Sequence, residues 1–204
     1  MKLAAIGDVA EVRPGLSTGT RMEHMEGGTH QLILSRHLVP GQGYRYADAH
    51  LFTINPGREA DRYVVKRGDV LFMSRGTRNV ASWIVEVPER AVAPVSFYVL
   101  RPRGAIEPGY LTWWLNQPTA QQAIADIRTG AGTPIVQRKT FAELRIPLPD
   151  FATQQTIASL GEVMTTEFNL LEQLATASQR LHDLTSERIA RDLFARTEKP
   201  DDQS

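Results

Sequence analysis

The sequence predicts an α+β fold in which a β-rich domain, residues 1–150, is followed by a long coiled-coil-forming C-terminal α-helix, residues 151–197. Short segments rich in β-branched and aromatic residues recur in the first part, each bounded by Gly, Pro or charge. Two prolines within Ile146–Asp150 interrupt this pattern, and no proline occurs from Thr153 to Arg196. The charged residues 198–204 are expected to be a disordered tail.

Five segments of the first part have the composition of strands, and two have that of helices. The strands are expected at Thr29–Ser35, Tyr63–Val65, Val70–Ser74, Ala81–Val87 and Ser96–Arg101. The helices are expected at Tyr110–Asn116 and Pro118–Ile127, before the break at Gly130–Gly132. Their large side chains are expected in the core: Tyr110, Trp113, Trp114 and Leu115.

The C-terminal segment carries apolar residues at steps of three, four and seven, as in a coiled-coil seam. Thr153 is the expected N-cap. A helix of this length does not fold back into a small domain, so its stripe needs a second long helix. Two shorter helices, broken near Gly161 or Thr185–Ser186 and packed on the core, are the alternative. The stripe comprises Ile157, Leu160, Met164, Phe168, Leu171, Leu174, Leu181 and Leu184.

The formal net charge is zero, but the charge is unevenly distributed. Residues 1–150 hold 18 Lys+Arg and 14 Asp+Glu, whereas residues 151–204 hold 5 and 9. Residues 36–103 alone hold 11 basic residues, ten of them Arg, and 6 acidic ones. Arg binds phosphate and the guanine edge, so this excess permits a nucleic-acid partner. A solvated, salt-bridged surface is the alternative.

No pattern of a catalytic or metal site is present. The His residues do not form a His-Glu-x-x-His pattern, and neither Gly-x-Ser-x-Gly nor a phosphate-binding P-loop occurs. The chain has no cysteine, which excludes disulfides. No signal-peptide core and no apolar run near the ~20 residues of a membrane span are found. We therefore expect a non-catalytic, cytoplasmic protein that binds no cofactor or metal.

Four motifs in order resemble the specificity subunits of type I restriction–modification enzymes. Gly68-Asp69-Val70-Leu71 is similar to the family's "GD(V/I)L" strand, and Tyr110–Asn116 is similar to its "yL..yL" helix. Residues 130–149 resemble its "G…L..i.iPlP" segment. Gln154–Ala158 resembles "EQ..Ia", with Gln154 where Glu is usual.

The resemblance implies a DNA target-recognition domain and a helix that separates two such domains. Family members normally carry two of each, so this chain is either a natural half-subunit or a fragment. A half-subunit needs to form a homodimer through its helix, and a twofold dimer is expected to read a bipartite inverted repeat in double-stranded DNA. The implied partners are DNA methyltransferase subunits, which use S-adenosylmethionine, with a restriction subunit left open.

The candidate DNA-binding residues lie in loops of the first domain. The turn Arg75-Gly76-Thr77-Arg78-Asn79 is the sharpest candidate, because Arg reads guanine and Asn reads adenine bidentately. The alternative is a surface hairpin whose arginines pair with Asp61 or Asp69. Four residues before the prolines are expected to contact phosphates, with a solvated turn as the alternative: Thr133, Gln137, Arg138 and Lys139. The full set is Arg36, Tyr44, Arg45, Tyr46, Arg58, Arg62, Arg75, Thr77, Arg78, Asn79, Thr133, Gln137, Arg138 and Lys139.

Two other functions stay open from the sequence alone. The chain is a candidate protein-interaction module that pairs with a full-length specificity subunit and regulates it. A small nuclease is the third possibility.

Overall fold

The computed structural model describes residues 2–18 and 22–197, except for the side chains of Arg58 and residues 195–197. The expected disordered tail, residues 198–204, therefore lies outside the described residues. The chain divides into two compact units, Met1–Thr165 and Thr166–Ser204. We call the first unit the head. The helix α5, Phe151–Thr197, begins in the head and continues through the second unit.

The head combines β-strands with short helices, as the sequence predicts. Its twelve described strands are β1 Lys2–Ala5, β2 Ala10–Pro14, β3 His30–Leu32, β4 Gly43–Arg45, β5 Thr53–Ile54, β6 Val70–Met73, β7 Ala81–Glu86, β8 Ala91–Val92, β9 Phe97–Pro102, β10 Arg128–Thr129, β11 Ile135–Val136 and β12 Arg145–Leu148. Its helices are α1 Ile6–Val9, α2 Pro108–Leu115, α3 Pro118–Asp126 and α4 Arg138–Glu143, with 3-10 turns η1 Ser35–His37, η2 Asp48–His50 and η3 Arg58–Tyr63.

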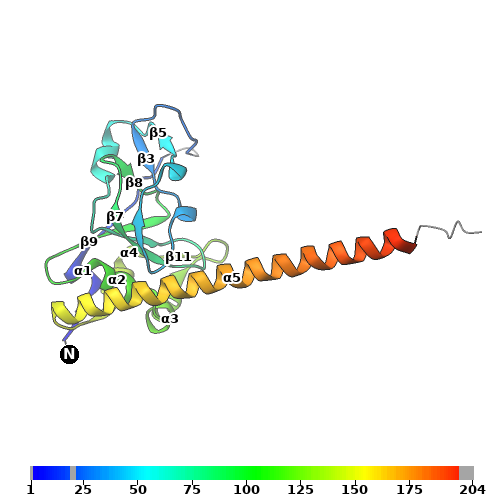
Figure 1. Ribbon diagram of the computed structural model, residues 1–204. Coiled ribbons are helices and arrows are strands. Elements are labelled where there is room, and N and C mark those ends of the chain that lie inside the picture. The colour runs from blue at the N-terminus through cyan, green and yellow to red at the C-terminus, as the bar shows by residue number, and fades with distance from the viewer. Residues whose placement is uncertain (1, 19–21, 198–204) are drawn as a thin grey trace, which may run out of the picture. The chain divides into compact units, whose positions relative to one another are not determined.

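A five-stranded sheet of order β2-β9-β6-β7-β4 forms the centre of the head. Its strands are antiparallel except for the parallel pair β4 and β7. A second sheet, β5-β3-β8, and the two-stranded pairs β1-β12 and β10-β11 complete the architecture. Within the head, the small sheet and the helices α1–α4 lie at opposite ends (Figure 1).

Alternating apolar residues put one core on each face of the central sheet. Val70 and Phe72 pack with Tyr110, Leu111 and Phe141 on the helical side. The other face is covered by a second cluster, which contains Ile33, Leu71, Ile84, Phe97 and Val99. The predicted core positions in α2 are confirmed for Tyr110 and Leu115, which are fully buried, while Trp113 and Trp114 pack against the core from partly buried positions.

Two predictions about the strands were wrong. The segment Tyr63–Val65 is not a strand: Tyr63 ends η3, and Val64 makes a single bridge to Val92. The prolines near residue 147 do not end regular structure, because Pro147 lies in β12 and pairs with Leu3 of β1. Both strands of this two-stranded sheet are edge strands. Proline has no backbone N–H to donate, and an edge strand tolerates this because one of its sides has no neighbouring strand.

The N-cap of α5 is Asp150 rather than Thr153. Its carboxylate accepts from the Thr153 backbone N–H at 2.9 Å and from the Thr153 hydroxyl at 2.8 Å. These bonds lower the pKa of Asp150, because they stabilise the charged form. Capping by Asp150 lets the helix begin at Phe151, two residues before the predicted N-cap.

The first turns of α5 are fixed to the head by a buried amide. Gln154 is 1% exposed, and its Oε1 accepts from the Glu107 backbone N–H at 2.9 Å. Its Nε2 donates to the backbone carbonyls of Ala105 and Pro149, at 3.1 and 3.0 Å.

No helix of the described part is long and apolar enough to cross a membrane.

Gly161 does not break α5, contrary to the alternative with two short helices. It is buried against Trp113, and a Cβ at this position would overlap the indole Cδ1. The missing side chain therefore allows a close approach between α5 and α2, which repays the lower helix propensity of glycine.

This contact predicts an unusual response to Gly161→Ala. In an isolated helix the change stabilises by about 1 kcal/mol, but here overpacking should destabilise the head by about 1–3 kcal/mol. Urea denaturation measures the difference, with Ser159→Ala on an exposed position as the control. A Gly161→Ala variant that is more stable than the parent would show that the indole is not tightly packed.

Candidate nucleic-acid interface

The turn after β6 presents two arginines from a rigid backbone. Gly76 takes φ +90°, which glycine adopts without strain, and its N–H donates to the Pro134 carbonyl at 2.8 Å. Arg75, Thr77 and Arg78 are exposed. Asn79 is different: it is 1% exposed, and its Nδ2 donates to the Met73 carbonyl at 2.9 Å. Its predicted base-reading role is therefore wrong, because its amide shapes the turn instead.

The structure brings this turn together with the second predicted segment. Arg75 forms a β-bridge with Ile135, and the Val136 N–H donates to the Ser74 carbonyl at 2.9 Å. Arg128, at the start of the β10-β11 hairpin, donates from Nη1 to the Thr77 carbonyl at 3.0 Å. We call the exposed or half-exposed cations of these segments the basic surface: Arg75, Arg78, Arg128, Arg138 and Lys139.

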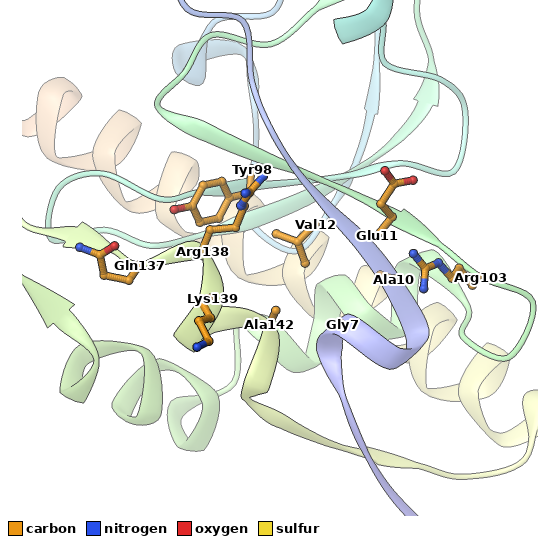
Figure 2. Close-up of a pocket in the computed structure, with 10 residues that line it drawn as sticks. All are labelled: Gly7, Ala10, Glu11, Val12, Tyr98, Arg103, Gln137, Arg138, Lys139 and Ala142. Atoms are coloured by element: carbon orange, nitrogen blue, oxygen red, sulfur yellow. The ribbon is translucent and has the colours of Figure 1, made fainter.

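Tyr98 of β9 lies at the junction of the two segments. Its hydroxyl donates to the Val136 carbonyl at 2.7 Å. Burial raises the pKa of Tyr98, while the nearby positive charges of Arg138 and Arg75 act in the opposite direction. Figure 2 shows the Arg138 side chain beside the Tyr98 ring. Arg75 and Arg138, 63 positions apart in sequence, therefore flank the same phenol.

No cation of the basic surface pairs with a carboxylate within the described residues. The two carboxylates that were the candidate partners contact other residues. Asp69 pairs with Arg101 at 2.7 Å, and Asp61 lies 3.1 Å from His30. The alternative of a salt-bridged hairpin is therefore wrong. Clustered cations without acidic neighbours repel one another, which favours binding of a polyanion.

A second group of predicted residues surrounds β4, away from these segments in sequence. Arg36 and Arg45 are exposed, and Arg45 lies 3.7 Å from Glu86. Tyr44 is 4% exposed and stacks on His50, so it belongs to the core rather than to a DNA-contacting edge. Tyr46, partly buried, meets the His50 ring edge-on.

Burial shifts the pKa of two side chains beside β4, Tyr44 and His37, towards their neutral forms. Burial raises the pKa of Tyr44 to about 12, with a smaller contribution from Tyr46. His37 stacks on His50 at a centroid separation of 4.5 Å. Burial, then His50 and Arg36, lower the pKa of His37, which favours the neutral form of this side chain.

The remaining predicted residues are dispersed. The side chain of Arg58 lies outside the described residues. Arg62 pairs with Glu59 at 2.6 Å and lies over the Tyr63 ring at 5.2 Å. Thr133 and Gln137 are exposed in and after the β10-β11 hairpin, and Gln137 donates to the Thr129 hydroxyl at 3.2 Å.

No group of three or more metal-ligating side chains occurs in the described part of the chain.

The second candidate functional element is the stripe on α5. Of the predicted stripe, Leu160, Met164, Phe168, Leu171, Leu174, Leu181 and Leu184 are exposed, each by more than half of its surface. Ile157 is the exception, because it packs against the head core. Further apolar residues of α5 are exposed but were not part of the predicted stripe: Val163, Leu170, Ile189 and Leu193.

The sequence matches the type I restriction modification DNA specificity domain over residues 2–176. The chain belongs to this family. The long helix and the basic surface are thus features of a specificity domain. Among curated proteins, none matches the chain by sequence.

Solved structures share the fold of this specificity domain. The HsdS subunit of Thermoanaerobacter tengcongensis has a TM-score of 0.54 at 18% identity, over 85% of this chain and 39% of that one. The S subunit of M. genitalium has a TM-score of 0.55 at 14% identity, over 97% and 46%. A chain from a structural study of complex assembly and conformational transition in a type I R-M system has 0.57 at 17%, over 93% and 43%. The specificity domain thus spans less than half the length of each.

Sequence reasoning missed Arg103, Arg128 and Tyr98 of this region. Arg128 lies two residues after the end of α3, and the break at Gly130–Gly132 marked a turn without marking the arginine before it. Tyr98 was correctly placed in a strand. The alternation of apolar residues along that strand does not indicate that the Tyr98 hydroxyl bonds to the carbonyl of Val136. Only the regional excess of Arg in residues 36–103 pointed towards Arg103.

Proposed function

We propose that this specificity domain recognises a sequence in double-stranded DNA through the basic surface and the turn Arg75–Asn79. The observation that carries the proposal is the cluster of cations without acidic partners, built from two segments joined by backbone hydrogen bonds. Phosphate contacts supply affinity, whereas side chains that reach base edges supply specificity. Arg75, Thr77 and Arg78 are suited to reading bases, and Thr133, Gln137, Arg138 and Lys139 to contacting phosphates.

The exposed stripe of α5 is proposed to pair with the same stripe of a second copy. A helix with a continuous exposed apolar stripe gains stability in water by burying it against another helix. Twofold pairing would provide two heads and hence an inverted-repeat, bipartite target. DNA methyltransferase subunits are the proposed further partners on this helix, consistent with the complex assembly named for one of the similar structures.

Selection from a random duplex pool tests the DNA-binding proposal. The chain, purified with its methyltransferase partner, should enrich two short half-sites in inverted orientation with a fixed spacer. Binding should weaken steeply as salt rises, because counterions compete for the phosphates. Failure to enrich any motif would reject sequence-specific recognition by this complex.

Arg75→Ala and Arg78→Ala test the reading turn. Each loss of a bidentate guanine contact should cost about 1–3 kcal/mol of discrimination, so the selected motif relaxes at one position. The fold should persist because both side chains are exposed, which circular dichroism checks. Arg90→Ala, which removes an exposed arginine next to Asp61, is the matched control. If both variants retain the parental motif and affinity, this turn does not read the DNA.

Leu171→Asp and Leu181→Asp test the pairing of the stripe. A charge placed in the seam loses its hydration on association, so both variants should sediment as monomers. Gln173→Asp, exposed on a different face of the same helix, should leave the dimer intact. Dimers of either leucine variant would contradict the seam. A parental chain that pairs only with a longer specificity subunit would support the regulatory module instead.

A further inference from the structure

An open cleft lies next to the basic surface, between α4 and the strand β2 (Figure 2). It has a volume of about 690 Å³. Three cations line it: Arg103 from the loop after β9, and Arg138 and Lys139 from the first turn of α4. Figure 2 shows Arg103 apart from Arg138 and Lys139, with Ala10, Glu11 and Val12 between them.

The charge of the cleft is strongly unbalanced. Glu11 is its single lining carboxylate, and this group lies 3.8 Å from Arg13. No ion pair within the described residues involves Arg103, Arg138 or Lys139. The five ion-paired arginines of the described part do not include these three cations, and Glu11, the one carboxylate of the cleft, faces Arg13 instead.

The backbone on both sides of the cleft is held in place. The Arg103 N–H donates to the Val9 carbonyl at 2.8 Å, which ties the loop after β9 to the end of α1. On the other side, α4 packs against α1 so closely that a Cβ on Gly7 would lie 3.3 Å from Cβ of Ala142. Cations on a fixed frame lose less entropy when they bind a ligand than cations on a mobile loop.

The arrangement fits an extended polyanion better than a compact anion. A small anion needs donors that converge on one point, whereas these cations are spread along the cleft over small and apolar residues such as Ala10 and Val12. The cleft also adjoins the reading turn, because Gln137 and Arg138, which line it, directly follow β11, and Arg75 forms a β-bridge with Ile135 of that strand. A DNA strand whose bases meet the turn would therefore pass its phosphates along the cleft.

We propose that this cleft binds the phosphate backbone of one DNA strand and that Arg103 is a positioning residue within it. The proposal rests on the proposed function and deepens it, since Arg103 was not among the residues expected from the sequence. Backbone contacts of this kind fix the register of a protein on the duplex and carry no sequence information themselves. Arg103 thus helps to hold the duplex against the turn Arg75–Asn79 without selecting its sequence.

The test compares Arg103→Gln with Arg90→Gln in the full chain bound to its methyltransferase partner. Affinity for a random-sequence duplex is measured by fluorescence anisotropy across a salt series. Loss of one phosphate contact should make the slope of log K against log salt shallower by about 0.9, and the double variant Arg103→Gln, Lys139→Gln by about 1.8. Arg90→Gln removes the same charge from an exposed site and should leave the slope near the parental value. The motif selected by Arg103→Gln should match the parental one.

Each other outcome is decisive. If Arg103→Gln and Arg90→Gln share the parental slope, Arg103 makes no phosphate contact and the assignment is overturned. An unchanged slope with an altered motif would make Arg103 a base reader, which also overturns it. If the parental complex does not bind duplex DNA at all, the proposed function itself fails, and this result is distinct from a failure of the cleft alone.

Discussion

The buried amide of Gln154 is the constraint on which the joining of helix and head depends. Its carbonyl oxygen and its amino group satisfy one backbone donor and two backbone acceptors, drawn from the loop before α2 and from the end of β12. An ionised Glu, usual here in the motif that the sequence resembles, has only acceptor atoms and would leave both carbonyls without a donor. A buried polar group without a hydrogen-bond partner lowers the stability of the fold. The first turn of α5 therefore has one low-energy position, in which all three of these hydrogen bonds form. About two turns further along α5, Gly161 packs against Trp113 and adds a second contact with the head.

Two groups of arginines in the head differ in their partners. Arg101 is held by the buried Asp69, and hydrogen bonding to this carboxylate raises the pKa of Arg101. Removal of either partner would leave a charge with poor solvation, so this pair is structural. The second set, on the basic surface and in the cleft, has no acidic partner among the described residues. Repulsion among these cations lowers the stability of the fold, and no contact within the head compensates for it. We therefore propose that this set binds an anionic ligand.

Sequence patterns predicted those parts of the head whose structure depends on near neighbours. The strands β6, β7 and β9 and the helices α2 and α3 were located because apolar spacing and turn residues specify them locally. Pairing of β1 with β12 joins residues 140 to 146 positions apart, and no local signal marks it. The roles of Asn79 and Tyr44 were misjudged for a related reason. Residue type suggests which chemistry is possible, but burial decides whether the group is available, and burial is set by contacts distant in sequence.

The net charge of zero hides the electrostatic character of the head. Residues 1–150 carry an excess of four basic residues, which residues 151–204 cancel with an excess of four acidic ones. Screening limits charge interactions to about 10 Å at ordinary ionic strength, so a ligand at the basic surface experiences the local excess rather than the total. In the proposed function, the cleft and the turn would act on different parts of the same ligand. Phosphates in the cleft would supply affinity for any sequence, and only the few side chains of the turn would need to differ for a different sequence to be read.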